Sequence, residues 1–202
     1  MNLLILLLGY LFGSFPSGYL AGRIAKGIDI RSLGSGSTGA TNVLRHIGKR
    51  AAITVFLIDV FKGFLSILLA KYFLLNDSWQ VAIGLSTLIG HIWPIWLNWK
   101  GGKAVATGLG VFLGISWQVG IATLGIFILM ITLFRIVSLA SVGAAIALPI
   151  IMYLSFKTSY ISLPFLVISL LAMTLVIWRH RENIVRLMKG KEPRIGKPSE
   201  IK

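Results

Sequence analysis

The residues best suited to chemistry lie in a polar loop over residues 33–48, LGSGSTGATNVLRHIG, between two long apolar runs. Clustered hydroxyl, amide and backbone N–H groups can surround one anion, and an arginine can bind phosphate through two parallel hydrogen bonds. The loop therefore predicts a phosphate-binding site, against the simpler alternative of a flexible linker. Its candidate ligands are Ser35, Gly36, Thr41, Asn42 and Arg45.

A second candidate segment runs from His91 to the turn Lys100-Gly101-Gly102-Lys103. Both glycines precede another apolar run, so their amides and the N-terminus of the next helix are predicted to face an anion that Lys103 attracts. The tryptophans nearby also fit an aromatic belt beside a basic turn, and the two interpretations are compatible. For His91, which lies about two turns inside an apolar run, we expect a structural hydrogen bond rather than proton transfer.

The third candidate segment opens the C-terminal tail with the sequence RHRENIVRL over residues 179–187. His180 and Asn183 are three residues apart, so on a helix they share one face. Glu182 and Arg186, four residues apart, can form an ion pair on the outer side. A juxtamembrane helix that binds anionic lipid explains the arginines. For His180 and Asn183, a substrate contact and this simpler role both remain open.

The composition places these segments in a membrane protein. The chain is 56% hydrophobic and 13% charged, with a net charge of +14, and apolar runs of about twenty residues recur along it. Most lysines and arginines lie between those runs, so the positive charge indicates topology and anionic lipid or substrate rather than nucleic acid. The lack of cysteine excludes disulfides and thiolate chemistry, and the scattered histidines and carboxylates indicate neither metal nor cofactor.

The apolar runs predict an all-α, polytopic membrane protein, with a single domain over residues 1–202 and seven transmembrane helices. The uncharged run 104–134 decides the number: if it crosses twice, turning near Ser116, most loop Lys and Arg residues gather on one side. The N-terminus is then outside and the C-terminus cytoplasmic, and the fourth helix is short, with about thirteen residues. The other predicted spans are 2–22, 51–75, 79–97, 138–156 and 159–178, before a basic tail over 179–202.

Two charges fall in the middle of the span 51–75, where unpaired charge is costly. Asp59 and Lys62 are three residues apart on that helix, so we expect an ion pair that braces the bundle. The same topology brings the three candidate segments and the connection from Arg135 to Ser141 to the cytoplasmic face. We therefore expect these four polar segments to build one pocket.

Together the three segments resemble the membrane-embedded, acyl-phosphate-dependent glycerol-3-phosphate acyltransferases of bacteria, over essentially the whole chain. The likeness lies in the loop ending Asn42-Val43-Leu44-Arg45, in Gly90-His91 with Lys100-Gly101-Gly102-Lys103, and in the tail motif from His180 to Leu187. The resemblance implies that acyl phosphate acylates the 1-hydroxyl of glycerol 3-phosphate. The products would be 1-acyl-glycerol 3-phosphate (lysophosphatidic acid) and phosphate, in the first step of phospholipid synthesis at the plasma (inner) membrane.

Acyl phosphate is already activated, so this reaction needs no covalent nucleophile. The His-x-x-x-x-Asp pair of the better-known glycerolipid acyltransferases is also missing from the sequence. Arg45 and Lys103 are then expected to bind phosphate and to neutralise charge on the leaving group. Ser35, Thr41 and Asn42 would donate hydrogen bonds to the phosphates. The loop amides, including that of Gly36, or those of Gly101 and Gly102, would stabilise the developing oxyanion.

His180 and Asn183 are expected to hold glycerol 3-phosphate, with Ser141 as a possible further ligand. The general base is either His180 or a phosphate oxygen of the substrate. We expect a monomer whose partners are glycerol 3-phosphate, acyl phosphate and membrane lipid, without nucleic acid, metal or cofactor. The alternative function is a membrane transporter of an organic phosphate, which is less favoured because the outer side lacks a matching polar cluster.

Overall fold

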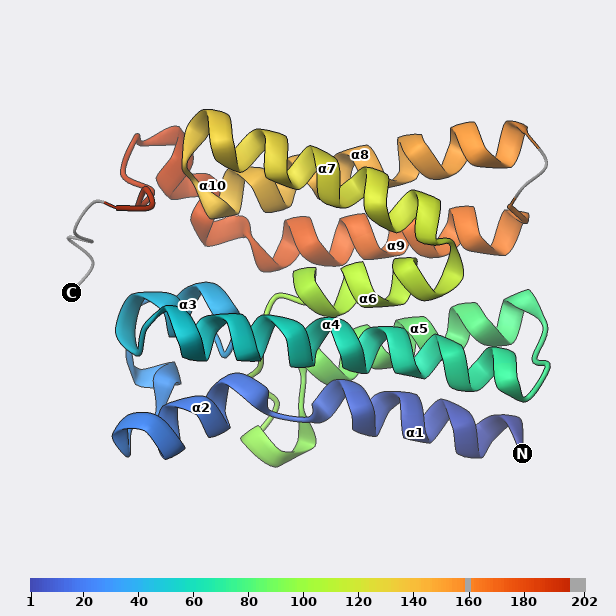
Figure 1. Cartoon of the computed structure of the whole chain (residues 1–202), viewed down its shortest axis with the longest axis horizontal. Helices are drawn as coiled ribbons and strands as arrows, with labels where there is room; N and C mark the ends of the chain where they lie inside the picture. The colour runs from blue at the N-terminus through green and yellow to red at the C-terminus, as the bar shows by residue number, and fades with distance from the viewer. Residues whose placement is uncertain (159–160, 197–202) are drawn as a thin grey trace. The chain divides into compact units, whose positions relative to one another are not determined.

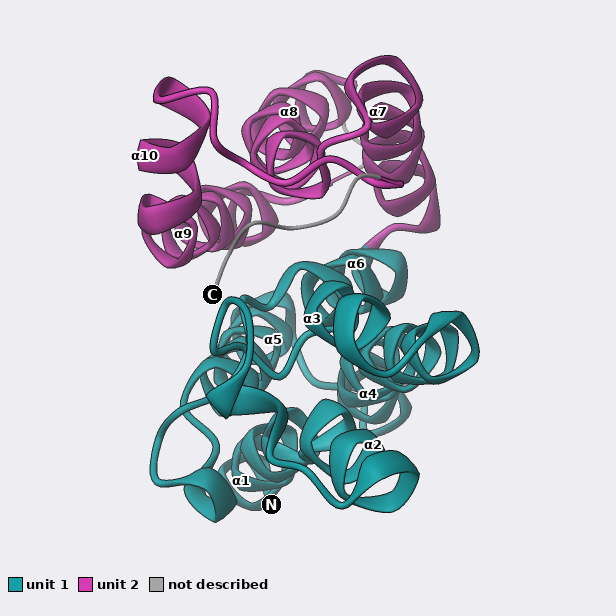
Figure 2. Cartoon of the chain, turned by 90° about the vertical axis from the view of Figure 1, so that its left-hand side faces the viewer, with its two compact units in different colours: residues 1–115 teal, residues 116–202 magenta. Residues whose placement is uncertain are grey.

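The computed structural model describes residues 1–158 and 161–196, which form two compact units (Figures 1 and 2). Unit 1 covers Met1–Ile115 and unit 2 begins at Ser116. Unit 1 holds α1 (Asn2–Ser14), α2 (Ser17–Lys26), η1 (Ile30–Ser32), α3 (Ala40–His46), α4 (Lys49–Tyr72), α5 (Asp77–Ile92), η2 (Ile95–Leu97) and α6 (Val105–Ile115). Unit 2 holds α7 (Trp117–Phe134), α8 (Val137–Lys157), α9 (Leu163–Arg179) and α10 (Arg181–Met188).

The predicted all-α membrane architecture is confirmed over the described residues, which contain no strand. Five segments are long and apolar enough to cross a membrane: Asn2–Lys26, α4, Asp77–Leu97, α7 and α8. A sixth is added if α9 and α10, which meet at a bend of 61°, count as one span. The predicted span 159–178 begins at two residues outside those described, and the predicted tail continues outside them at 197–202.

The run 104–134 divides where the sequence predicts a turn. Helix α6 ends at Ile115 and α7 begins at Trp117, and the Ser116 hydroxyl accepts a hydrogen bond from the Val119 N–H at 3.5 Å. A serine in extended conformation that caps the next helix in this way separates two helices. With 11 residues, α6 is short for a span, as predicted for the fourth helix.

The first apolar segment is broken between Ser14 and Ser17, where Pro16 lacks a backbone N–H. Glycines on both sides of the break let other backbone approach closely. A Cβ at Gly13 would overlap the Thr87 carbonyl of α5, and a Cβ at Gly18 would overlap the Thr38 carbonyl of the 33–48 loop. Small residues at such crossings allow tight helix packing inside a membrane. The break therefore brings α1 and α2 against α5 and the candidate loop.

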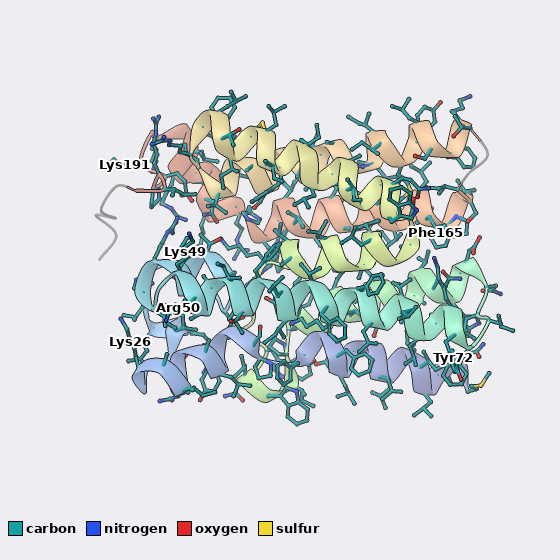
Figure 3. The ribbon with its side chains drawn as sticks, viewed as in Figure 1. Lys26, Lys49, Arg50, Tyr72, Phe165 and Lys191 are labelled. Carbon is teal, nitrogen blue, oxygen red and sulfur yellow. The ribbon has the colours of Figure 1, made fainter. Side chains whose placement is uncertain are left out.

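Unit 1 is a helix bundle in which α1 packs on α5, and α4 packs on α3, α5 and α6. In unit 2, α8 lies between α7 and α9, with α10 packed against both α8 and α9. Four labelled side chains show the two ends of unit 1 (Figure 3). Lys26, Lys49 and Arg50 lie at the end where α4 begins, and Tyr72 lies at its other end.

Candidate active site

The 33–48 loop is organised around the side chain of Asn42, which is 2% exposed. Its amide nitrogen donates to the carbonyls of Ile30, Leu33 and Ser37 at 3.0, 3.0 and 2.9 Å. Its carbonyl oxygen accepts from the Ser35 N–H at 3.3 Å. The amide therefore serves the loop itself. The contact of Asn42 with a substrate phosphate stays a prediction.

The other predicted residues of this loop lie around that buried centre. Ser35, Thr41 and Arg45 are half-buried, and Gly36 is exposed with a left-handed φ of 64°. Arg45 is carried by the short helix α3, whose first turn begins directly after the glycine-rich segment. The loop thus has a fixed interior and a polar rim, and this rim is where a phosphate could bind.

Hydrogen bonds hold the Gly-Gly-Lys turn against the end of α5. The Gly101 N–H donates to the Ile92 carbonyl at 3.1 Å, and the Gly102 N–H donates to the His91 carbonyl at 3.0 Å. In this structure both amides therefore donate to protein carbonyls, and their contact with an anion stays a prediction. Lys103, which follows them, is half-buried. The turn therefore places Lys103 directly after two glycines whose backbone is held against α5.

Within unit 1, the structure brings the loop and the second segment together. The Arg31 guanidinium, just before the loop, donates to the Leu97 carbonyl at 2.8 Å. Thr38 of the loop and His91 of α5 line one small cavity with Lys62 of α4. The buried pair in α4 is confirmed, with Lys62 Nζ 2.8 Å from Asp59 Oδ1. The predicted structural hydrogen bond of His91 is also present, since its Nδ1 lies 3.1 Å from the Thr107 hydroxyl.

In unit 2, His180 occupies the joint between α9 and α10, and both His180 and Asn183 are buried. The His180 Nδ1 lies 2.8 Å from the Val176 carbonyl oxygen. Because a carbonyl oxygen only accepts, this contact places a proton on Nδ1 and makes Nε2 the acceptor nitrogen of the neutral ring. Ser141 is also buried, in the first part of α8.

Glu192 is a residue of this region that the sequence reasoning missed. Its carboxylate accepts hydrogen bonds from the Asn183 amide at 2.6 Å and from the Ser138 hydroxyl of α8 at 2.8 Å. It also pairs with Arg186 Nε at 2.7 Å. From the sequence, Glu182 was the expected partner of Arg186, and in the structure that partner is Glu192. The tail is held further by the Ile195 N–H, which donates to the Arg135 carbonyl at 2.8 Å. Glu192 therefore fixes the orientation of the Asn183 side chain.

Two opposing effects set the pKa of Glu192. Burial raises the pKa, but hydrogen bonds from Asn183, Arg186 and Ser138 together outweigh it, so the pKa lies below its ordinary value. A carboxyl group whose pKa is lowered in the folded protein stabilises the folded state at pH values above the ordinary glutamate pKa. That stabilisation is lost as the pH falls through the lowered pKa.

We expect wild-type protein to lose thermal stability partly through Glu192 over the acid interval below the ordinary glutamate pKa. Glu192→Gln removes this titration, so the pH dependence of its melting temperature in detergent should be shallower over that interval. Asp29 also has a lowered pKa, because Arg31 hydrogen-bonds to it. Asp29→Asn is therefore the variant to compare with Glu192→Gln, because it also exchanges a carboxylate of lowered pKa for an amide. A Glu192→Gln profile parallel to that of wild type would contradict the assignment.

Comparison with known proteins gives a consistent result over the length of the chain. The family model described as glycerol-3-phosphate acyltransferase matches residues 3–190. The glycerol-3-phosphate acyltransferase of Prochlorococcus marinus strain NATL2A is 86% identical over 198 residues, covering 98% of this chain and 100% of that protein. The corresponding protein of Synechococcus sp. strain CC9902 is 62% identical, covering 96% of each chain.

Two solved structures are also similar, both of the integral membrane glycerol 3-phosphate acyltransferase PlsY (YgiH). One is its glycerol 3-phosphate form and the other its lysophosphatidic acid form. Each is 37% identical to this chain with a TM-score of 0.87, covering 96% of this chain and 96% or 95% of the other. With a family match across nearly all of its residues, this chain belongs to the glycerol-3-phosphate acyltransferase family of integral membrane enzymes.

Proposed function

We propose that this enzyme transfers a fatty acyl group from acyl phosphate to the 1-hydroxyl of glycerol 3-phosphate. The hydroxyl oxygen attacks the acyl carbonyl carbon, the bond from that carbon to the phosphate oxygen breaks, and inorganic phosphate leaves. The observation that carries this proposal is the likeness to PlsY in forms with glycerol 3-phosphate and lysophosphatidic acid. An acyl phosphate donor is consistent with the chemistry, because it has a good leaving group and needs no cysteine nucleophile, and the chain has no cysteine.

In unit 1, the proposed phosphate ligands are the two cations that follow the glycine-rich segments. Arg45 and Lys103 bind phosphate and neutralise the charge that develops on the leaving group. Ser35, Thr41 and the Gly36 amide belong to the polar rim of the loop and add hydrogen bonds. Asn42, Gly101 and Gly102 have a different part: they fix the backbone that carries Arg45 and Lys103.

In unit 2, His180 and Asn183 hold glycerol 3-phosphate, and Ser141 is a further ligand. The contact of His180 Nδ1 with the Val176 carbonyl supports Nε2 as the nitrogen that accepts the hydroxyl proton. A phosphate oxygen of the substrate is the alternative base. If His180→Ala kept a near-normal kcat at saturating substrate, the substrate phosphate would be the base.

We further propose that residues 1–202 form one monomeric domain that crosses the plasma membrane seven times. The N-terminus is then outside, and the substrates bind at the cytoplasmic face. The gathering of Lys26, Lys49 and Arg50 at one end of unit 1 supports this orientation, because cytoplasmic loops are rich in Lys and Arg (Figure 3). The chain has no cysteine, so a single introduced cysteine is the only thiol that a labelling reagent can modify. In intact cells an impermeant maleimide should label Tyr72→Cys and leave Lys49→Cys unlabelled.

Purified enzyme in detergent decides between an acyltransferase and a carrier. With acyl phosphate and radiolabelled glycerol 3-phosphate, we expect labelled lysophosphatidic acid and one phosphate released for each product molecule. The same acyl chain supplied as acyl-CoA should give at most a background rate. Arg45→Ala and Lys103→Ala should each reduce kcat/KM by roughly 100-fold or more, the scale found when one electrostatic ligand is removed from an active site. Vesicle uptake of glycerol 3-phosphate without lipid product would instead indicate a transporter.

A further inference from the structure

A buried polar network in unit 1 connects the break between α1 and α2 to the Gly-Gly-Lys turn. At its centre, Asp59 is 1% exposed and Lys62 is 5% exposed, and both lie within the apolar helix α4. The chemistry proposed above uses neither residue. Buried charges inside a membrane span are costly and are commonly functional. The contacts of this pair indicate what it does.

Lys62 stabilises the helix break that Pro16 introduces. Its ammonium group donates to the Phe15 carbonyl at 3.1 Å, a group that lies in the interruption between α1 and α2. An unsatisfied carbonyl at membrane depth is unfavourable, so a lysine there stabilises the broken helix. Lys71, on the same helix, acts in the same way and donates to the Ile115 carbonyl at the α6–α7 break at 3.1 Å. Unlike Lys62, Lys71 is exposed.

Asp59 connects the break to α5. Its Oδ1 atom accepts from the Ser17 hydroxyl at 2.7 Å and pairs with Lys62 Nζ. The same Oδ1 lies 3.8 Å from His91 Nδ1. The hydroxyl of Thr107, on α6, lies within hydrogen-bond distance of the same His91 nitrogen, at 3.1 Å. The Thr107 hydroxyl hydrogen-bonds to the imidazole, and the Asp59 carboxylate lies beside the same ring nitrogen.

The carbonyl and the ring of His91 both contact the Gly-Gly-Lys turn. Its carbonyl accepts the Gly102 N–H at 3.0 Å. Its ring lies directly against Gly102, because a Cβ at that position would overlap His91 Nε2. His91 is therefore fixed by the network on one side and in contact with the residue before Lys103 on the other.

The turn needs such support because its backbone is strained. Asn98, Trp99 and Ala104 have left-handed φ values of 51°, 63° and 59°, which are unfavourable for residues with a Cβ. Backbone of this kind persists only where surrounding contacts hold it. Lys103 lies between Gly102 and the last of these strained residues. Its position thus depends on contacts made by His91.

We propose that Asp59 is a positioning residue for the Gly-Gly-Lys turn: through His91 it holds the backbone that places Lys103. The proposal rests on the phosphate-binding role proposed for Lys103. It gives the ion pair a function beyond bracing the helices. Removal of the carboxylate should therefore loosen residues 98–104 and weaken binding of the substrate whose phosphate Lys103 contacts.

The test uses full-length enzyme in detergent and the double variant Asp59→Asn/Lys62→Met, which removes both buried charges and leaves neither one unpaired. The first measurement is hydrogen–deuterium exchange of peptides covering residues 98–104. Lys71→Met is the matched control, because it removes a lysine of α4 that also donates to a carbonyl at a helix break. We expect faster exchange in the double variant and wild-type exchange in this control.

The second measurement is the KM of each substrate. The double variant should raise the same KM that Lys103→Ala raises, by roughly 10-fold, since small misplacements of a binding group cost factors of this order. Lys71→Met should lower the melting temperature and leave both KM values unchanged. Exchange in the turn equal to wild type would overturn the proposal. Faster exchange in the double variant with no KM effect of Lys103→Ala would support the positioning role and reject the phosphate role of Lys103.

Discussion

Asn42→Ala is expected to lower acyl transfer by roughly 30-fold or more while the membrane helices stay folded. The substitution removes the amide that donates to the carbonyls of Ile30, Leu33 and Ser37, of which those of Ile30 and Leu33 each keep one backbone donor. A buried acceptor left unsatisfied costs about 1–3 kcal/mol, so the ordered loop should lose about 2 kcal/mol or more. A loss of that size lowers the equilibrium constant for ordering of the loop by about 30-fold. Initial rates at saturating concentrations of both substrates measure it.

Asn76→Ala is the matched control for this variant. Asn76 also accepts from a backbone N–H through its side chain, that of Trp79 at 3.1 Å, but it caps α5 at an exposed position. Loss of such a cap costs about 1 kcal/mol of stability and should leave the rate unchanged. Asn42→Asp keeps the shape and the acceptor but loses the donors, so it should behave like Asn42→Ala. Normal turnover in both Asn42 variants would show that the loop does not depend on this side chain.

Local rules were sufficient for several features. Asp59 and Lys62 pair because residues three apart on a helix are neighbours and because unpaired charge is costly in a membrane. The break at Ser116 follows from a polar residue in an apolar run too long for one helix. The family likeness was readable because each motif is continuous over a few residues. In all these cases, the information lies within one or two turns of one element.

The hydrogen bonds of three predicted site residues could not be read from local rules. Asn42, Gly101 and Gly102 were expected to face a ligand because their chemistry suits an anion. Their hydrogen bonds instead go to carbonyls of neighbouring protein segments, and sequence does not reveal which acceptor lies closest. A donor needed to hold the backbone of a site looks the same in sequence as a donor that binds the substrate.

Glu192 was missed for a related reason. It is one acid among Lys189, Lys191 and Arg194, a pattern typical of a solvated tail. In the structure it is 7% exposed and accepts from Ser138 of α8 and from Asn183 of α10. One signal was present: a lone carboxylate in a strongly basic segment has many potential cationic partners. Its burial against α8 could come only from the fold.

Gly102→Ala is expected to raise the KM of the substrate whose phosphate Lys103 contacts by roughly 10-fold or more. The added methyl group would overlap the His91 ring, and Thr107 limits where that ring can move. Overpacking of this kind typically costs about 1–3 kcal/mol, which is comparable to the free energy that holds a strained turn in place. The backbone at Gly102 is therefore expected to shift and to carry Lys103 with it. Steady-state kinetics with each substrate varied in turn measures the effect.

Gly108→Ala separates this mechanism from a general effect of alanine. In α6, a Cβ at Gly108 would meet only Leu88 Cδ2 at 3.8 Å, an ordinary contact, and alanine favours a helix over glycine. That variant should keep both KM values and melt at the wild-type temperature or above. A double-mutant cycle then tests whether the added methyl group acts on the His91 ring. In a His91→Ala background the ring is absent, so Gly102→Ala should raise the KM little further. Full additivity of the two substitutions would mean that the methyl group acts elsewhere than on His91.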